Sequence, residues 1–550
     1  MRRFVLLLLT NALILTALAA TVWFDNERNR GITFTPAPRP VPWADGPLVG
    51  VNAFNLHLEP DPEALTHTLQ LAHELGARFV RMQVPWDDIE IHGRGDFEDR
   101  RNLASVGAVS AWAKYDRIVA TARHFDIELI MRLERPPAWA REVGRATPAF
   151  QAGLAFDGNS IGPPDDLADY GNFVRTLVRR YQGQVRFFQI WNEPNLKVEW
   201  GWREPRPAEF VALLKVGYQA VKAANPAALV LFPSLSPVDG LDSRAPMTEL
   251  EYLDAVYAAG GGAFFDIMSA QAYGLGQPPD EHRYVRLRPA DNRVWSRPLD
   301  TRADVSRVVL LHEVMVRNGD SAKPVWIGEF GWNSAPERIP SERRFTWGAP
   351  VSEALKADYI VGQIERARRE WPWLGVMNLW MLRYGGYQAP DPADPTPYFA
   401  LVQRDWTPLP AYTRLRDYLH QPTVAGVGAH TWAHPAVERT ASGWRVRFNG
   451  QRLTLAGASG DALRIRLDDQ PIEMKPTSIE GLPALITPTL ADSTHILEVR
   501  GASPPEWFII ARDPPAPWFW NGVPALLLVI LLVVSGATMQ ALGAIGQKAT

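Results

Sequence analysis

The feature that most limits how this chain can fold is a repeated alternation of short apolar runs with longer amphipathic segments between Leu48 and Leu419. Short apolar runs are typical of buried parallel strands, and the segments between them are long enough to be crossover helices. The predicted strands are Leu48–Phe54, Arg78–Val84, Ile127–Leu133, Val185–Ile190, Ala228–Phe232, Phe264–Ala270, Val325–Gly328 and Gly375–Met381. The predicted helices are Pro62–Leu75, Ser110–His124, Leu167–Tyr181, Ala208–Ala224, Met247–Ala259 and Ala411–Leu419.

Eight strands joined by crossovers predict an α/β fold of the TIM (β/α)8 barrel type over residues 47–423. An open, doubly wound sheet is the alternative for such a pattern. That fold would want a glycine-rich phosphate-binding turn after its first strand, and Asn52-Ala53-Phe54-Asn55 is not such a turn. The barrel is therefore the favoured prediction.

Two of the predicted strands lead directly to a glutamate. The run Val185–Ile190 is followed closely by Glu193, and the run Val325–Gly328 by Glu329. Catalytic side chains of α/β barrels lie where the strands end, so both carboxylates are expected at the same face of the barrel. Glycoside hydrolysis uses two carboxyl groups placed in this way, one as the acid/base and the other as the nucleophile or base.

The segments that carry these glutamates resemble the strand-four and strand-seven signatures of the clan A retaining glycoside hydrolases. The first is Trp191-Asn192-Glu193-Pro194-Asn195-Leu196-Lys197 and the second is Gly328-Glu329-Phe330-Gly331. The first is most similar to glycoside hydrolase family 39, the group of β-xylosidases, iduronidases and exopolysaccharide hydrolases, and branches of family 5 are the alternative. The resemblance covers about Pro47 to Leu419. It implies a retaining O-glycosidase with Glu193 as acid/base and Glu329 as nucleophile.

The same resemblance implies further residues of the site. Arg81 and Tyr273 would donate hydrogen bonds to Glu329, and Asn192 would bind the 2-hydroxyl of the sugar. Many relatives carry a histidine two residues before this tyrosine, whereas the chain has Gln271. A glutamine donates and accepts hydrogen bonds but carries no charge, which leaves the exact substrate open.

Tryptophan is abundant, with 21 residues in the chain, and flat aromatic faces pack well against the C–H groups of sugar rings. By resemblance, Trp380 is the aromatic floor of the subsite that holds the cleaved sugar. Six further tryptophans fall in predicted loops beyond strand ends: Trp86, Trp139, Trp200, Trp202, Trp332 and Trp347. We expect about half of the six to line the cleft, and Trp332 is predicted to bind substrate.

Composition excludes several other classes of protein. A net charge of −3 gives no sign of a polyanionic partner, so nucleic acid binding is not expected. The chain has no cysteine, which excludes disulfides, thiolate metal sites and a cysteine nucleophile. The 11 histidines show no paired ligand spacing, so no metal and no cofactor are predicted.

After about Val424 the pattern changes from β/α units to short strands. Trp444–Phe448 alternates with a period of two, and Asn449-Gly450 predicts a hairpin turn before Arg452–Leu455. Leu463–Leu467, His495–Val499 and Trp507–Ala511 are further predicted strands. Residues 424–513 are therefore predicted to form a small antiparallel β-sandwich, which either supports the barrel by packing or binds sugar independently.

The two ends of the chain carry apolar segments. Met1-Arg2-Arg3 precedes an uncharged run to Phe24, so residues 1–24 are predicted to be a cleaved export signal or a retained N-terminal membrane anchor. Residues 25–46 are predicted to be a Pro-rich linker. Residues 514–550 are predicted to hold a Pro-rich spacer, Trp518 and Trp520 at the membrane interface, and a transmembrane helix.

These patterns together predict a protein of the cell membrane whose catalytic domain is extracytoplasmic and acts on a cell-surface or extracellular polysaccharide or oligosaccharide. Two alternatives stay open at the level of sequence. A transglycosylase would pass the same intermediate to a sugar hydroxyl instead of water. A non-catalytic carbohydrate-binding envelope protein would use the barrel without chemistry.

Overall fold

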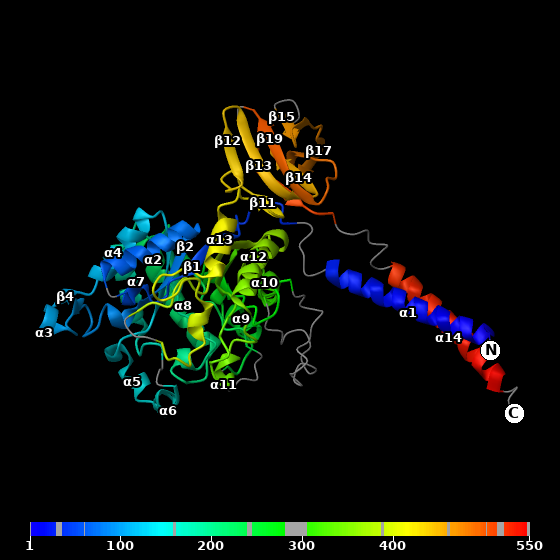
Figure 1. Ribbon diagram of the computed structural model, residues 1–550. Helices are drawn as coiled ribbons and strands as arrows, with labels where there is room; N and C mark the ends of the chain where they lie inside the picture. The colour runs from blue at the N-terminus through cyan, green and yellow to red at the C-terminus, as the bar shows by residue number, and fades with distance from the viewer. Residues whose placement is uncertain are drawn as a thin grey trace.

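The computed structural model describes residues 2–28, 36–59, 61–157, 161–238, 245–280, 305–386, 390–458, 463–501, 503–513 and 522–546, with only the backbone of residues 22–28, 156–157 and 546. It has three parts: a large α/β domain, a smaller domain of β-strands beside one end of it, and two long helices formed by the two ends of the chain (Figure 1). The predicted spacer at residues 514–521 and its two tryptophans lie outside the described residues.

Eight parallel strands form one sheet in the order β7-β6-β5-β2-β1-β10-β9-β8. The strands are β1 (Leu48–Asn52), β2 (Phe79–Pro85), β5 (Glu128–Glu134), β6 (Phe187–Ile190), β7 (Leu229–Leu231), β8 (Met268–Gln271), β9 (Val325–Phe330) and β10 (Leu374–Leu379). The two edges meet, because Leu231 bridges to Ile267 in parallel and the backbone N–H of Phe232 donates to the carbonyl of Ile267 over 2.8 Å. This closure confirms the predicted TIM barrel.

Helices cover the outside of the barrel. They are α2 (Pro62–Leu75), α4 (Ala113–His124), α7 (Leu167–Arg180), α8 (Pro207–Ala224), α9 (Glu249–Ala258), α10 (Arg307–Arg317), α12 (Glu353–Glu370) and α13 (Pro410–Leu419). Local chemistry sets their ends, as in α2, where the side chain of Asp61 accepts a hydrogen bond from the N–H of Ala64 and Gly76 ends the helix with φ of 90°.

Two of these helices, α10 and α12, were absent from the sequence prediction. The core-facing stripe of α12 is present at Ala357, Ile360, Val361, Ile364 and Ala367, but polar residues such as Lys356, Gln363 and Arg366 are buried beside it and obscure the pattern. The predicted helix from Ser110 begins at Ala113, because Val109 and Ser110 form a short strand, β4, with β3 (Glu98–Asp99). Other short elements lie in the loops: α3 (Leu103–Val106), α5 (Glu142–Arg145), α6 (Pro148–Asp157) and α11 (Ser341–Arg344).

The interior of the barrel differs between its two ends. A cluster of buried side chains fills the amino end of the strands: Phe79, Ile130, Phe187, Leu231, Ile267, Trp326 and Val376. Toward the carboxyl end the buried inward residues become polar, as at Asn52, Arg81, Gln189 and Glu329. The barrel is thus closed by apolar packing at the amino end of its strands and lined by hydrogen-bonding groups at the carboxyl end.

Residues 36–46 contain no helix or strand, yet they are packed rather than free. The carbonyl of Pro38 accepts a hydrogen bond from the indole N–H of Trp507, in the smaller domain. The carbonyl of Trp43 accepts one from Trp326 in β9, and the Trp43 ring lies edge-on to Phe187 in β6. A Cβ on Gly375 would meet the Trp43 carbonyl at 2.1 Å, so only glycine allows this approach. The described part of the predicted linker therefore joins the two domains and closes the amino end of the barrel.

The smaller domain is a sandwich of two five-stranded antiparallel sheets, as predicted. One sheet has the order β11-β20-β14-β18-β17 and the other β12-β13-β19-β15-β16. The strands are β11 (Gly428–His430), β12 (Val437–Thr440), β13 (Gly443–Gly450), β14 (Arg452–Ala456), β15 (Arg464–Leu467), β16 (Gln470–Pro471), β17 (Lys475–Ile479), β18 (Leu482–Ile486), β19 (Ser493–Arg500) and β20 (Trp507–Ala511). Between the sheets Val446, Phe448, Leu453 and Phe508 are completely buried.

The predicted hairpin at Asn449-Gly450 is wrong. Both residues belong to β13, where they pair with Thr494 and Ser493 of β19, and the next strand, β14, belongs to the opposite sheet. The chain thus changes sheets at Gln451 instead of turning back on itself. An Asn-Gly pair forms a hairpin turn only where the strands before and after it pair with each other. Here β13 pairs with β12 and β19, and β14 pairs with β18 and β20.

Arg512 fixes the sandwich to the barrel. Its guanidinium donates to the carbonyl of Arg369 at the end of α12 over 2.9 Å, and also to Asp492 and Asn449 within the sandwich. The side chain is only 6% exposed. A charged group so buried and so fully bonded indicates a defined contact between the two domains.

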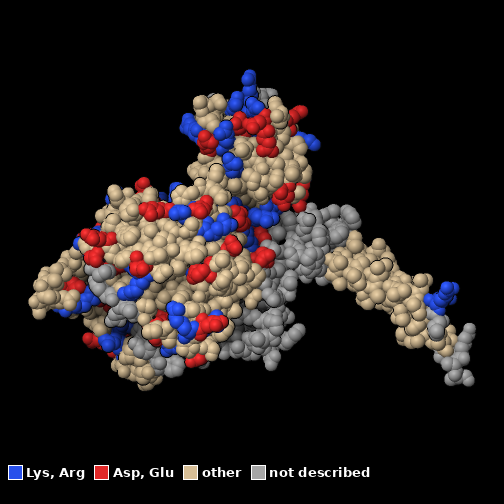
Figure 2. All heavy atoms as spheres, in the orientation of Figure 1, with Lys and Arg blue, Asp and Glu red and all other residues tan. Residues whose placement is uncertain are grey.

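The two ends of the chain form long apolar helices that lie side by side, α1 (Arg2–Arg28) and α14 (Val523–Gly546) (Figure 1). Within them, Arg2–Thr21 and Val523–Ile545 are long and apolar enough to cross a membrane, with mean hydropathies of 2.2 and 2.3. In Figure 2 the pair is almost free of charge along its length, whereas the barrel and the sandwich carry mixed acidic and basic side chains. Helix α1 extends four residues past Phe24, the predicted end of that segment.

Candidate active site

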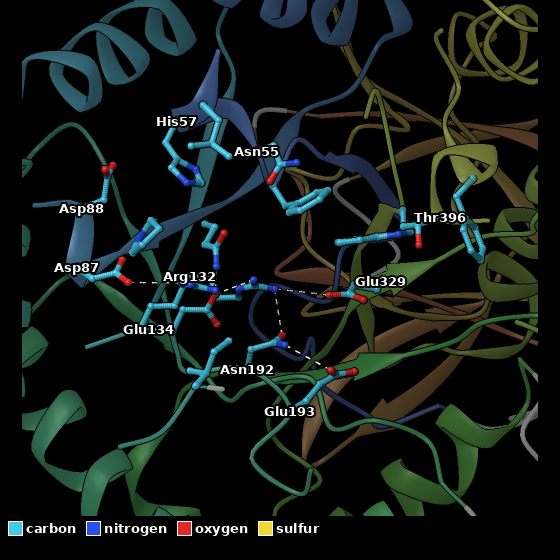
Figure 3. A pocket seen from close by; sticks show the side chains of 18 of the residues that line it. Asn55, His57, Asp87, Asp88, Arg132, Glu134, Asn192, Glu193, Glu329 and Thr396 are labelled. Carbon is cyan, nitrogen blue, oxygen red and sulfur yellow. Dashed lines mark hydrogen bonds and ion pairs between the residues drawn. The ribbon is translucent and has the colours of Figure 1, made fainter. Parts of the chain in front are cut away.

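A cavity of about 590 Å³ opens at the carboxyl end of the barrel strands (Figure 3). Its lining includes six of the eight site residues proposed from sequence: Asn192, Glu193, Gln271, Tyr273, Glu329 and Trp380. Trp347, one of the six loop tryptophans, also lines it. Cavities of this size are typical of small-molecule sites. Arg81 lies directly beneath it, bonded to residues of the lining.

The two predicted catalytic carboxyl groups share one hydrogen-bond donor. The side-chain nitrogen Nε2 of Gln271 lies 2.6 Å from Oε1 of Glu193 and 3.4 Å from Oε2 of Glu329. Two atoms so close to a common nitrogen cannot be farther apart than the sum of these distances. The strand ends therefore bring together the two glutamates that are 136 positions apart in the chain.

Arg81 organises the floor of the site from the middle of β2. Its Nη1 donates to Oε1 of Glu329 and to Oδ1 of Asn52, each over 2.8 Å. Its Nε donates to Gln189 over 2.8 Å, and Nη2 lies 3.4 Å from Oδ1 of Asn192. The side chain is 1% exposed, so its charge is compensated by Glu329 within the protein rather than by water.

Glu329 also accepts a hydrogen bond on its other oxygen. The hydroxyl of Tyr273 donates to Oε2 over 2.8 Å. Burial, with the adjacent Glu329 charge, raises the pKa of Tyr273 well above its usual value, so the phenol keeps its proton. Oε1 thus accepts from Arg81, and Oε2 accepts from Tyr273 and, over 3.4 Å, from Gln271. These donors hold Glu329, which is 6% exposed, in a single orientation at the wall of the cavity.

Glu193 has a different environment. Burial and the charge of Glu329 raise its pKa to about 7, although the hydrogen bond from Gln271 acts in the opposite direction. The backbone places the side chain by unusual angles, because φ is 68° at Trp191 and 36° at Glu193. Left-handed φ values at residues other than glycine are uncommon and gather at functional sites.

Two buried charged residues of β5 complete the site and were not predicted. Nη1 of Arg132 donates to Oδ1 of Asn192 over 3.1 Å, and Nη2 donates to Glu134 over 2.7 Å. Both residues line the cavity (Figure 3). The signal for them was present in Met131-Arg132-Leu133-Glu134, where two charges alternate with apolar residues in a strand and must share one face.

Asn192 connects this pair to a further buried carboxyl group. Its Nδ2 donates to Oε1 of Glu199 over 3.2 Å and lies 3.5 Å from Oε2 of Glu193. Burial, with the charges of Glu134 and Glu193, raises the pKa of Glu199 well above its usual value. The oxygen Oδ1 of Asn192 is occupied by the two arginines, so its amide group is fixed with the N–H₂ toward the two carboxyl groups.

An irregularity in β9 aims Glu329 into the barrel. Ala270 of β8 pairs with Ile327, but the next residue, Gln271, pairs with Glu329, so Gly328 is an extra residue in β9. Such a bulge changes the direction of the following side chain. A Cβ on Gly328 would meet the hydroxyl of Ser234 at 2.2 Å, so the position has room for glycine only.

The tryptophans only partly follow the prediction. Trp380 and Trp347 line the cavity, and the Trp380 ring stacks on Phe54 with ring centroids 4.8 Å apart. Trp332 does not line it, being 1% exposed with its indole N–H bonded to the carbonyl of Gln277. None of the other four lines it either: Trp86, Trp139, Trp200 and Trp202. The expectation that half of the six loop tryptophans line the cleft is therefore wrong. Three of the six, Trp86, Trp200 and Trp332, are buried by packing, and Trp139 and Trp202 are half-buried outside the cavity lining.

No protein-family model and no curated protein matches the chain. Among solved structures it is similar to a family 39 glycoside hydrolase from the gut symbiont Bacteroides cellulosilyticus WH2, with 17% identity, a TM-score of 0.48, and 83% of this chain and 82% of that chain covered. It is also similar to a monomeric beta-xylosidase from Caulobacter crescentus CB15, with 15% identity, a TM-score of 0.45, and coverage of 85% and 98%. A third is GH5_18 from Streptomyces cattleya in complex with Manb1-4GlcNAc, with 15% identity, a TM-score of 0.46, and coverage of 69% and 83%.

Proposed function

We propose that the protein is a retaining glycoside hydrolase that cleaves O-glycosidic bonds of a cell-surface or extracellular polysaccharide. The observation that carries this proposal is the contact of a single amide nitrogen, Nε2 of Gln271, with both Glu193 and Glu329. It supports a pair of carboxyl groups that act on one sugar from opposite sides of the same bond.

The short separation favours retention over inversion. Inverting enzymes keep their carboxyl groups roughly 6.5–9.5 Å apart, because a water molecule must fit between the sugar and the base. The nearest oxygens of Glu193 and Glu329 lie closer than that, since both are within 3.4 Å of one nitrogen. Retaining enzymes, in which the second carboxylate attacks directly, keep about 5–5.5 Å.

In the first step Glu329 attacks the anomeric carbon while Glu193 protonates the departing oxygen. The raised pKa of Glu193, about 7, keeps a large fraction of it protonated near neutral pH. The hydrogen bonds from Arg81 and Tyr273 hold Glu329 in position for the attack. The bond to the leaving group breaks as the bond to Glu329 forms.

In the second step Glu193, now ionised, removes a proton from a water molecule that attacks the same carbon. The bond to Glu329 breaks and the product leaves with its original configuration. Asn192 is proposed to bind the 2-hydroxyl of the sugar, because its N–H₂ group lies beside Glu193. Trp380 is proposed as the floor of the same subsite, and neither step uses a metal or cofactor.

The proposed location is the cell membrane, with the barrel outside the cytoplasm. It rests on α14, which is apolar along its length and follows the sandwich directly in the chain. A polysaccharide of the cell surface or of the surrounding medium is the substrate such a placement favours.

The test is chemical rescue of the full-length protein in detergent. With an aryl glycoside that has a good leaving group, Glu193→Ala is expected to form the covalent intermediate on Glu329 but to hydrolyse it slowly. Added azide needs no general base, so it is expected to restore turnover and give a glycosyl azide of retained configuration. Glu329→Ala is expected to stay inactive, because the nucleophile is gone.

The matched control is Glu59→Gln, which alters a buried carboxylate outside the cavity lining. It is expected to leave the response to azide unchanged. A glycosyl azide of inverted configuration, or no product in Glu193→Ala, would rule out Glu193 as acid/base. Products longer than the substrate in the unmutated protein would identify a transglycosylase, and absence of any turnover on a broad glycan panel would favour the carbohydrate-binding alternative.

A further inference from the structure

The helices at the two ends of the chain contact each other along a regular seam. In α1 the buried and half-buried side chains include a series spaced by three and four residues: Phe4, Leu7, Asn11, Ile14, Leu18 and Thr21. A second series follows the same spacing in α14: Pro524, Leu527, Leu531, Val534, Thr538, Ala541 and Ile545. An average spacing of 3.5 residues is what keeps one face of a helix against a partner helix.

Three polar side chains meet in the middle of this seam. The Nδ2 of Asn11 donates to Oγ1 of Thr538 over 2.7 Å, and Oγ of Ser535 donates to Oδ1 of Asn11 over 2.8 Å. The hydroxyl of Thr538 also donates to the carbonyl of Val534, one turn earlier in its own helix. Every polar group of the cluster therefore has a partner without water, as a hydrocarbon environment requires.

The position of the cluster matches the centre of a bilayer. Eight residues separate Arg3 from Asn11, which is about 12 Å of helix at 1.5 Å per residue. Half of the hydrocarbon thickness is about 15 Å. A single buried asparagine in such a seam fixes the register of two helices, because any shift leaves its amide unpaired.

The outward faces of both helices are apolar and unpaired in the described structure. Leu13 is 71% exposed, Met539 is 70% exposed, and Leu9, Leu532 and Val533 are each exposed by more than 60%. Figure 2 shows no charged side chain along the described pair up to its far end, where basic side chains appear. An apolar surface around the whole pair is suited to lipid rather than to water.

We propose that α1 is retained after export and forms an antiparallel pair of transmembrane helices with α14, joined at Asn11, Ser535 and Thr538. The start of α1 and the end of α14 lie at the same far end of the pair (Figure 1). That end carries Arg2 and Arg3, and positive charge favours the cytoplasmic side. The catalytic domain then follows α1 on the opposite side of the membrane.

The proposal is tested by cysteine cross-linking in membranes that contain the full-length protein. The chain has no cysteine of its own, so each introduced pair gives an unambiguous signal. Asn11→Cys with Thr538→Cys places two thiols where the side chains now bond at 2.7 Å. Oxidation is expected to link them within one chain, which is visible as a faster band on a non-reducing gel.

The matched control is Leu13→Cys with Met539→Cys, which lies close along the same two helices but points outward. We expect about tenfold less cross-linking in the control, because the two side chains face away from each other. Equal cross-linking of the two pairs, or none in the first, would overturn the proposed seam.

A second measurement needs no substitution. The intact mass of the protein extracted from membranes is expected to include residues 2–19. A mature chain that begins near Ala20 would show that α1 is a cleaved signal and would overturn the proposal. Neither measurement depends on catalysis, so either the proposed helix pair or the proposed glycosidase activity can be disproved without the other.

Discussion

The amide nitrogen of Gln271 donates a hydrogen bond of 2.6 Å to Oε1 of Glu193. A hydrogen bond donated to a carboxyl oxygen stabilises its ionised form, so Gln271 lowers the pKa of Glu193 from the value that burial and Glu329 would set. This contact therefore controls where the acid/base titrates as well as where it lies.

The first prediction concerns the pH dependence of kcat/KM. The acid must be protonated for the first step, so activity is lost as pH rises through the pKa of Glu193, about 7. In Gln271→Leu the opposing hydrogen bond is absent, the pKa rises, and the basic limb is expected to move to higher pH. Gln271→His, which keeps a donor, is the control. A basic limb that stays in place in Gln271→Leu would contradict the assignment.

The second prediction isolates the influence of Glu329 on Glu193. Burial is the larger cause of the raised pKa and remains in Glu329→Gln, but the repulsive charge is removed. The pKa of Glu193 is therefore expected to fall toward its usual range while staying above it. The protonated carboxyl stretch in difference infrared spectra measures this change. Glu59→Gln should leave that titration unaltered, and an unchanged pKa in Glu329→Gln would disprove the coupling.

The third prediction concerns stability. Arg81→Ala removes the partner of a buried carboxylate and leaves the Glu329 charge without its 2.8 Å ion pair. Such a loss costs about 3–5 kcal/mol, so Tm is expected to drop clearly in thermal unfolding. Arg81→Ala combined with Glu329→Gln removes both charges and should regain part of the loss. If the double variant is less stable than Arg81→Ala alone, the ion pair is not the source of the effect.

The fourth prediction concerns the bulge before the nucleophile. Gly328→Ala would place a Cβ 2.2 Å from the hydroxyl oxygen of Ser234, which overpacks the site by about 1–3 kcal/mol and displaces Glu329. The Ser234 hydroxyl is buried and has no hydrogen-bond partner among the described residues. Ser234→Ala is therefore expected to be nearly neutral by itself. When both substitutions are present, the Cβ of Ala at position 328 lies 3.5 Å from the Cβ at position 234, which is an ordinary contact.

The combination Gly328→Ala with Ser234→Ala is expected to restore most of the kcat and the Tm lost in Gly328→Ala. Kinetics with one aryl glycoside and thermal unfolding of all three variants measure both quantities. Failure of the second substitution to rescue either one would show that the backbone at Gly328, and not the lack of space, requires glycine.

The barrel and its two glutamates could be predicted because their signals are local. Each predicted strand is a short apolar run, and Glu193 and Glu329 follow two of these runs directly. The polar network beneath them was harder to predict. Arg132 and Glu134 matter only because alternate residues of β5 point inward, and a charged residue in a strand has no visible direction until the sheet is closed.

Other errors came from the same limit. Trp332 and Trp200 stand in loops next to the site, but whether a loop side chain faces the cavity depends on packing between distant segments. The Asn-Gly pair at 449–450 has the composition of a tight turn, yet its strand pairs with β12 and β19 and not with β14. Contacts between segments far apart in the chain decide both the direction of a loop side chain and the partner of a strand. A window of ten residues carries no information on such contacts.

The contact of Trp43 with Phe187 and Trp326 has a bearing on which polymers the enzyme could reach. These residues lie at the amino end of the barrel, and the sandwich also stands beside that end, opposite α6 and α11 (Figure 1). With α1 and α14 both in the membrane, as proposed, the chain joins them to the described domains at residues 36 and 513, on the side away from the catalytic mouth. A glycan strand that approaches the mouth therefore comes from the face opposite these two points of attachment.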